Sequence, residues 1–292
     1  MEICILVAEY WSVYRDNKHV EVEEKARFGP DGIREKVNKI IESIGIFALI
    51  GIITGILTGI TGSSGVIIVV PSMTFLGYSF HIAVGTSLFI DVITTVSVVY
   101  VYTRGKKIEW RIGLILGGGA LIGAQIGAHV AIFISDTPLE IIFTVVALIM
   151  ARQSFQRAKK GLKIRHRDIS HPNYLGFLIS LPIGIMTGTL GTSGGIMFIA
   201  VMMLLYSLDA KTMVGTATLS MFVSALSGTT GYFILNSVDI VGGVIIGLIS
   251  LVSGLYFAKR ALGMRDKTIY YFLGTVFIIV ALLEAVKIAT NI

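Results

Sequence analysis

Two stretches of this chain combine glycines with small hydroxyl side chains at matching spacing. Residues 55–65 read Gly-Ile-Leu-Thr-Gly-Ile-Thr-Gly-Ser-Ser-Gly, and residues 184–195 read Gly-Ile-Met-Thr-Gly-Thr-Leu-Gly-Thr-Ser-Gly-Gly. Glycine lets the main chain leave helical geometry and approach a bound molecule closely, and hydroxyls donate hydrogen bonds without adding charge. A duplicated break of this kind inside apolar segments is typical of a binding site built from discontinuous membrane helices.

The helix that restarts after each break would favour an anion. Near Gly65 and Gly194, unpaired main-chain N–H groups and the positive end of a helix dipole would point at the bound molecule. A tetrahedral or pyramidal oxyanion suits such a lining. The alternative is that these small residues only allow helices to pack closely, as they often do in membranes. The binding candidates are Thr61, Gly62, Ser63, Ser64 and Gly65 in the first stretch and Gly191, Thr192, Ser193, Gly194 and Gly195 in the second.

A second repeated pattern follows each break. Residues 81–87 read His-Ile-Ala-Val-Gly-Thr-Ser, and residues 211–217 read Lys-Thr-Met-Val-Gly-Thr-Ala. Both patterns stand near the start of an apolar segment, from which their hydroxyls could reach the breaks. The alternative is that they hydrogen-bond to their own helix. The supporting candidates are Thr86, Ser87, Thr216 and Thr218.

Asp91 is an ionisable residue within an apolar segment, between Ile90 and Val92, and its counterpart in the second half is Met221. A charge inside a bilayer is costly, which makes such a residue a functional-site hypothesis by default. We therefore consider Asp91 a candidate for proton coupling. The alternative is a structural aspartate, protonated or hydrogen-bonded to a neighbouring hydroxyl. His129 and Glu284 are secondary candidates.

The composition indicates a protein with several membrane spans. Hydrophobic residues make up 54% of the chain and charged residues 14%, whereas soluble domains carry roughly 25% charged residues. The single cysteine, Cys4, excludes an internal disulfide and a multi-cysteine metal cluster. The basic pI, about 9.3, is explained by loop cations that orient the protein, so no nucleic-acid partner is expected. We expect a multi-pass protein of the cell membrane, the plasma membrane of a prokaryote.

Two of the predicted membrane segments are too long for a single crossing. As straight helices they would extend to about 48 Å, whereas the hydrocarbon core is about 30 Å thick. Each is therefore predicted to form two half-helices of about 12 to 15 residues, folded as a re-entrant hairpin buried in protein. The two long segments, 44–76 and 174–206, come first and fifth among eight; the others are 82–103, 112–133, 138–151, 213–235, 239–258 and 269–288.

The distribution of basic loops favours hairpins over crossings. With two hairpins, the basic loops 104–111, 152–167 and 259–267 fall on one side of the membrane, as the positive-inside tendency requires. Three crossings and one hairpin per half give an all-α fold of two inverted repeats, whose hairpin tips would meet near the midplane. The predicted divisions are a polar tail with an amphipathic helix (1–43), a first repeat (44–151), a basic cytoplasmic loop (152–173) and a second repeat (174–292).

Enzyme signatures do not compete with this interpretation. The sequence lacks a Gly-x-x-x-x-Gly-Lys-Ser/Thr nucleotide loop and a His-Glu-x-x-His zinc motif. The turn around Ser193 is similar to that of a serine nucleophile, but no motif ties it to the membrane histidine His129. We therefore expect no enzyme and no cofactor.

Taken together, these motifs resemble those of the sulfite exporter TauE/SafE family, also called the 4-toluene sulfonate uptake permease family. The resemblance covers about residues 44–290 and rests on the first glycine stretch followed by Pro71, on Ala83 to Ser87, and on their second-half copies. It departs from the pattern in the long tail and in Ala200, which stands where the first half has Pro71.

The resemblance implies a transporter of a small sulfur-containing oxyanion, sulfite or an organosulfonate. The two opposed hairpin tips predict a secondary transporter that works by alternating access. A passive anion channel and a membrane partner subunit without transport of its own are the alternatives. Membrane lipid is an expected partner, and a homodimer is left open.

Overall fold

The computed structural model describes residues 30–160, 171–191, 194–206 and 208–265, together with short helical stretches between 267 and 282. The predicted tail is thus described only from Pro30, and the predicted basic loop only at its two ends. No strand occurs in these parts of the chain. The helices are α3 (Pro30–Thr61), α4 (Val66–Phe75), α5 (Phe80–Arg104), α6 (Trp110–Ala131), α7 (Asp136–Lys160), α8 (Pro172–Leu190), α9 (Gly194–Leu205), α10 (Ala210–Ile234) and α11 (Ile240–Ala261).

Six of the described helices are long and apolar enough to cross a membrane. Their length follows from the rise of 1.5 Å per residue, which requires about 20 apolar residues for the hydrocarbon core. The prediction of an all-α protein with several membrane spans is thereby confirmed. The six are the apolar part of α3 (Ile44–Thr61), α5, α6, α7 as far as Gln156, α8 and α11.

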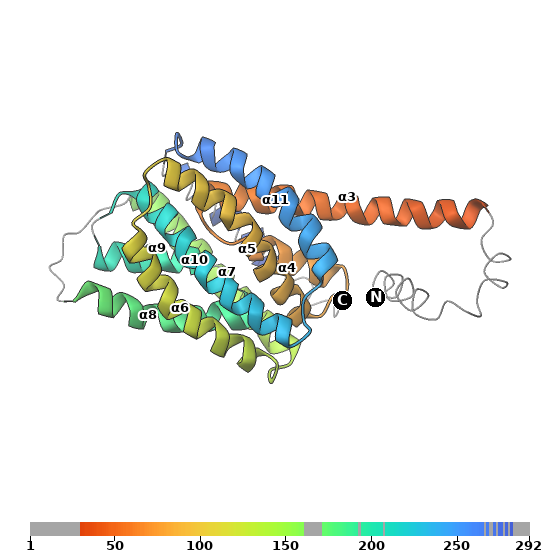
Figure 1. Ribbon diagram of the computed structural model, residues 1–292, viewed down its shortest axis with the longest axis horizontal. Helices are drawn as coiled ribbons and strands as arrows, with labels where there is room; N and C mark the ends of the chain where they lie inside the picture. Colours follow the sequence, from red (N-terminus) through yellow and green to blue (C-terminus); the bar gives the residue numbers. More distant parts are fainter. Residues whose placement is uncertain are drawn as a thin grey trace.

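The first helix differs from the prediction of a short amphipathic helix followed by a half-helix. α3 runs without interruption from Pro30 to Thr61, and in Figure 1 its N-terminal part projects beyond the other helices. Between Asp31 and Thr61 the chain has no proline to end the helix. The two helices of the first long segment therefore differ in length, with 18 apolar residues in α3 and 10 residues in α4.

Glycines bring two pairs of helices into backbone contact. α6 packs along α8, and α11 packs along α3. A Cβ added to Gly59 would lie 2.9 Å from the main-chain nitrogen of Ala258, and one added to Gly123 would lie 2.8 Å from that of Ile185. The glycines therefore set the close approach of each pair, as small residues do between membrane helices.

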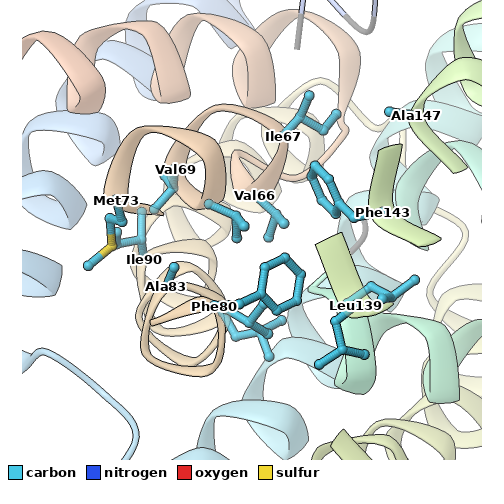
Figure 2. Close-up of a cluster of buried hydrophobic side chains, with 14 of the residues drawn as sticks. Val66, Ile67, Val69, Met73, Phe80, Ala83, Ile90, Leu139, Phe143 and Ala147 are labelled. Carbon is cyan, nitrogen blue, oxygen red and sulfur yellow. The ribbon is translucent and has the colours of Figure 1, made fainter. Parts of the chain in front are cut away.

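The short helix α4 is buried in protein rather than exposed to lipid. Seven of its ten residues are buried. Figure 2 shows Val66, Val69 and Met73 of α4 beside Ala83 and Ile90 of α5 within one apolar cluster. A helix too short to span the bilayer is thus enclosed by other helices, which is the setting that broken membrane segments require.

The two halves of the chain make reciprocal contacts. The Oγ1 atom of Thr86 accepts a hydrogen bond of 2.8 Å from the main-chain nitrogen of Asp239, and that of Thr216 accepts one of 2.9 Å from the nitrogen of Glu109. Each residue has its counterpart 130 positions away (216 − 86 and 239 − 109). Such an exchange of equivalent contacts is characteristic of two-fold symmetry. The opposite orientation of the halves in a membrane stays a prediction.

The loops after α5 and α11 lie together at one end of the helix bundle, called here the basic end. A Cβ added to Gly105 would lie 3.3 Å from Cδ1 of Leu262. The Nζ atom of Lys211 donates a hydrogen bond to the carbonyl oxygen of Leu262. At the opposite end, Nδ1 of His81 lies 2.6 Å from Oδ1 of Asp136.

Candidate functional site

Both glycine stretches interrupt their helices, and they do so with the same backbone conformation. Residues 62–65, the first break, separate α3 from α4, and residues 191–193, the second break, separate α8 from α9. Gly62 and Gly191 each have φ of 62°, in the left-handed region. Glycine adopts this region without strain and commonly ends helices there. The repeated glycine is thus explained by the turn that it makes.

In the interior, each break touches the start of the helix that follows the other break. A Cβ added to Gly195 would lie 3.1 Å from Cα of Ser63 and 2.5 Å from the carbonyl oxygen of Gly62. A Cβ added to Gly191 would lie 3.0 Å from Cγ1 of Val66. Residues about 130 positions apart in sequence are therefore in direct main-chain contact, with no room for a side chain between them.

The second pair of helices forms a hairpin that opens at the basic end. The hydroxyl of Tyr206, just after α9, donates to Oδ1 of Asn173 at 3.0 Å and to the carbonyl oxygen of Pro172 at 3.1 Å, both at the start of α8. A Cβ added to Gly176 would lie 3.0 Å from Cδ2 of Leu116, in the second turn of α6 after the basic loop.

The first pair of helices opens at the opposite end. A Cβ added to Gly242 would lie 3.4 Å from the ring of Phe47 in α3, and Gly242 stands at the start of α11. The chain leaving α4 reaches Phe80, whose main-chain nitrogen donates to Oδ2 of Asp136 at 3.3 Å. Each broken pair thus enters and leaves the bundle at one end, and the two pairs do so at different ends.

The hydroxyls of the first break stabilise the break itself. The Oγ1 atom of Thr61 donates to the carbonyl oxygen of Leu57 at 2.7 Å, lies 2.6 Å from the hydroxyl of Ser63 and accepts from its main-chain nitrogen at 3.1 Å. The hydroxyl of Ser64 accepts from the nitrogen of Val66 at 3.0 Å. All three hydroxyl residues are buried.

Asp91 occupies the end of α4 at which the sequence analysis expects an anion. It lies on α5 and is 2% exposed. Its Oδ1 atom accepts from the main-chain nitrogen of Gly65 at 3.0 Å, and its Oδ2 atom accepts from the hydroxyl of Ser64. A carboxylate at a helix N-terminus is favoured by the helix dipole. At this break, the protein's own acidic side chain therefore occupies the position at the start of α4.

The second break differs from the first at the position that corresponds to Asp91. The counterpart of Asp91 is Met221, whose sulfur lies 3.0 Å from the position of a Cβ on Gly195. Thr192 and Ser193 lie outside the described residues, so only Gly191, Gly194 and Gly195 of the predicted second set are placed. The N-terminus of α9 is thus set among apolar and main-chain atoms.

Three buried hydroxyls near the first break have no hydrogen-bond partner. They belong to Thr54, Thr58 and Ser87, each 0% exposed. Such groups are rare in native structures, because burial without a partner costs about 1–3 kcal/mol. The sequence analysis missed Thr54 and Thr58, although their spacing of four residues places them on one face of α3.

The supporting candidates divide into two groups. Thr86 and Thr216 bind loop nitrogens, as described above, and the structure does not bring their hydroxyls to the breaks. Thr218 does reach the first break, because its Oγ1 atom lies 2.8 Å from the position of a Cβ on Gly62. Of the secondary candidates, His129 is exposed and bonds to the carbonyl oxygen of Gln125, and Glu284 lies outside the described residues.

The chain is similar in sequence to a known protein family and to probable membrane transporter proteins. The sequence model of the family described as "Sulfite exporter TauE/SafE" matches residues 47–283. The chain is 26% identical over 264 residues to the probable membrane transporter protein YunE of Bacillus subtilis, covering 80% of this chain and 94% of YunE. It is 28% identical over 231 residues to the probable membrane transporter protein YdhB of the same organism, covering 77% and 92%. No solved structure gives a significant match.

Proposed function

Because this chain belongs to the sulfite exporter TauE/SafE family, we propose that it is a secondary transporter of a small oxyanion, sulfite or an organosulfonate. The family match and the six apolar helices show a multi-pass membrane protein of a transporter family. A transporter family also favours a role without catalysis.

The observation that carries the proposal is the contact between the two breaks. Gly195 stands against Gly62 and Ser63, and each broken helix pair opens at a different end of the bundle. Irregular backbone inside a membrane protein is tolerated where it is buried or lines a binding site. Two such breaks meeting in the interior support alternating access, in which a small movement of either hairpin would open the site to one side.

The anion is proposed to bind on the side of the second break. There Met221 takes the place that Asp91 has in the first half. Main-chain N–H groups at Gly194 and Gly195 and the hydroxyls of Thr192 and Ser193 are the proposed donors, since such groups bind oxyanions at helix starts. Thr218 is a proposed neighbour through its contact with Gly62.

Coupling is proposed to depend on Asp91. Its buried carboxylate lies within hydrogen-bond reach of the first break, so a positive charge arriving there would change the packing of the break. The sequence analysis predicts a proton in this role. Inverted orientation of the halves belongs to the same proposal and is supported by the reciprocal contacts of Thr86 and Thr216.

Flux measurements on the purified full-length protein in proteoliposomes test this proposal. We expect uptake of radiolabelled sulfite that saturates with concentration, is competed by organosulfonates and responds to an imposed cation gradient. Ohmic single-channel currents would instead establish the passive channel. Absence of flux with sulfite, sulfonates, thiosulfate and sulfate would reject transport and leave a partner subunit.

A further inference from the structure

The surroundings of Asp91 hold more oxygen atoms than the hydrogen bonds of the break use. Oδ1 and Oδ2 of Asp91 accept from Gly65 and Ser64. The hydroxyls of Thr54, Thr58 and Ser87 have no partner. The first break thus combines a buried carboxyl group with three hydroxyls that have no partner.

These oxygens belong to two helices, α3 and α5, that both contact α4. On α3, Thr54 lies against the position of a Cβ on Gly65, with its Cγ2 atom nearest and Oγ1 at 3.3 Å, and Thr58 follows one turn later on the same face. On α5, Ser87 precedes Asp91 by one turn, on the face that also carries Ala83 and Ile90. Figure 2 shows Ala83 and Ile90 beside α4.

The second half separates this arrangement from ordinary helix packing. The counterparts of Thr54, Ser87 and Asp91 are Ile183, Ala217 and Met221, and Cγ2 of Ile183 lies 3.3 Å from the position of a Cβ on Gly194, just as Thr54 does at Gly65. In the second half, the equivalent stretch of backbone thus packs against apolar side chains. At Thr187, the counterpart of Thr58, the hydroxyl donates to the carbonyl oxygen of Ile183 at 2.9 Å. The unused oxygens are therefore not required by the broken helix itself.

The charge and the ligand type indicate a monovalent cation. Among the described residues no group of three His, Cys, Asp or Glu side chains could hold a metal ion, so a divalent site is not favoured. α4 and the part of α3 from Ile44 to Thr61 carry no charged residue. A single carboxylate with hydroxyl oxygens suits a hard monovalent ion, since hard cations take oxygen ligands. A proton would neutralise Asp91 but leave the three hydroxyl oxygens unused.

We propose that Asp91 and the hydroxyl oxygens of Thr54, Thr58 and Ser87 form a sodium site at the first break. In other transporters, main-chain carbonyl oxygens at broken membrane helices bind coupling sodium ions. The site would make sodium the coupling ion of the transporter, and this last step alone rests on the proposed function. The two breaks then bind unlike ions, the cation at α4 and the anion at α9.

Binding is tested on the purified full-length protein in detergent, with the melting temperature followed while choline chloride is replaced by sodium chloride at constant ionic strength. Binding to the folded state raises the melting temperature with sodium concentration. Direct binding of radioactive sodium gives the affinity. We expect Thr54→Val and Ser87→Ala each to weaken sodium binding about tenfold, the loss of one hydrogen-bond-strength contact to a charge, and Asp91→Asn to abolish it.

The matched control is Thr187→Val, because Thr187 is the second-half counterpart of Thr58 and its hydroxyl already has a partner. It should bind sodium as the wild type does. Should Asp91→Asn fail to fold, Thr54→Val and Ser87→Ala decide, since each removes only an unpartnered hydroxyl and no hydrogen bond within the protein is lost. Equal melting temperatures in sodium and choline chloride, or unchanged sodium affinity in both hydroxyl variants, would overturn the site.

Flux separates this inference from the proposed function. Sodium binding together with sulfite uptake that follows an imposed sodium gradient supports both. Sulfite uptake driven by a pH gradient, without sodium binding, overturns the sodium site and leaves the transporter proposal intact. Sodium binding without any anion flux keeps the site and rejects the transporter.

Discussion

Gly62 and Gly191 show at residue scale how main-chain conformation shapes the candidate site. Both hold a φ of 62°, and both stand where an added Cβ would meet a neighbouring helix. At Gly62 the nearest atoms are Cγ1 of Val214 at 2.7 Å and Oγ1 of Thr218 at 2.8 Å. The breaks thus depend on the lack of a side chain for two separate reasons, conformation and space.

Replacing Gly62 with alanine should therefore reduce transport activity more than it reduces insertion of the protein into the membrane. The left-handed conformation costs an L-residue roughly 1–2 kcal/mol, and the contact with Val214 adds overpacking to this. We expect sulfite uptake in proteoliposomes to fall at least about tenfold, the factor that 1.4 kcal/mol represents. Gly45→Ala is the control, because no atom lies within 4 Å of its added Cβ. Normal uptake by Gly62→Ala would show that the geometry of this break does not matter for transport.

Asp91 illustrates why a residue's role depends on its partner. The sequence shows a carboxylate in an apolar helix, and two interpretations remain open there, coupling and structure. The structure shows the carboxylate bound to Gly65 and Ser64 at the end of α4. Asp91 therefore contributes to the shape of the break and also supplies the carboxyl group on which the proposed cation site depends.

At the scale of elements, the interface between α6 and α8 depends on which face of α6 its glycines occupy. A Cβ on Gly123 would meet the backbone of α8, 2.8 Å from the nitrogen of Ile185, whereas one on Gly118 would meet only Cε2 of Phe177 at 3.8 Å. Backbone atoms cannot move aside as the end of a flexible side chain can.

The two substitutions Gly123→Ala and Gly118→Ala should consequently differ. Overpacking of the kind expected at Gly123 costs typically 1–3 kcal/mol, and Gly118→Ala should leave the melting temperature in detergent within error of the wild type. Melting temperatures of the two purified variants measure this difference. Equal melting temperatures would mean that α6 and α8 do not pack as closely as described.

The reciprocal hydrogen bonds predict matched effects in the two halves. Thr86→Val leaves the main-chain nitrogen of Asp239 without an acceptor, and Thr216→Val does the same to Glu109. Each loss should reduce the free energy of unfolding by about 1–3 kcal/mol. The melting temperatures of the two variants should therefore fall to a similar extent. Thr189→Val is the control, because its hydroxyl bonds only within its own helix. A large effect in one half alone would contradict the equivalence of the two contacts.

At the scale of the whole molecule, the arrangement of loops distinguishes hairpins from crossings. Gly105 and Leu262 are neighbours at the basic end. If the two long segments simply crossed the membrane, the loops after α5 and α11 would fall on opposite sides. Their proximity supports the hairpin interpretation, with both basic loops on the cytoplasmic side by the positive-inside tendency.

Labelling of single cysteines in intact cells tests this arrangement. In a Cys4→Ser background, Glu109→Cys and Gly263→Cys should both be protected from an impermeant maleimide, and Ser135→Cys should react. All three positions are exposed, so burial does not limit the reaction. Labelling of Gly263→Cys and protection of Glu109→Cys would place these loops on different sides and reject the hairpins.

The sequence alone determined the membrane class, the position of both breaks and their duplication, because these follow from local properties: apolar length, glycine conformation and residue order. It did not determine how long the helices of each hairpin are, since no residue within α3 ends that helix before Thr61. Nor did it show the partner of Asp91, because Ser64 lies 27 positions away and a hydrogen bond across that distance depends on how helices pack. Periodicity indicates which face of a helix is buried, but only the tertiary structure decides which atoms meet there and which hydroxyls remain without a partner.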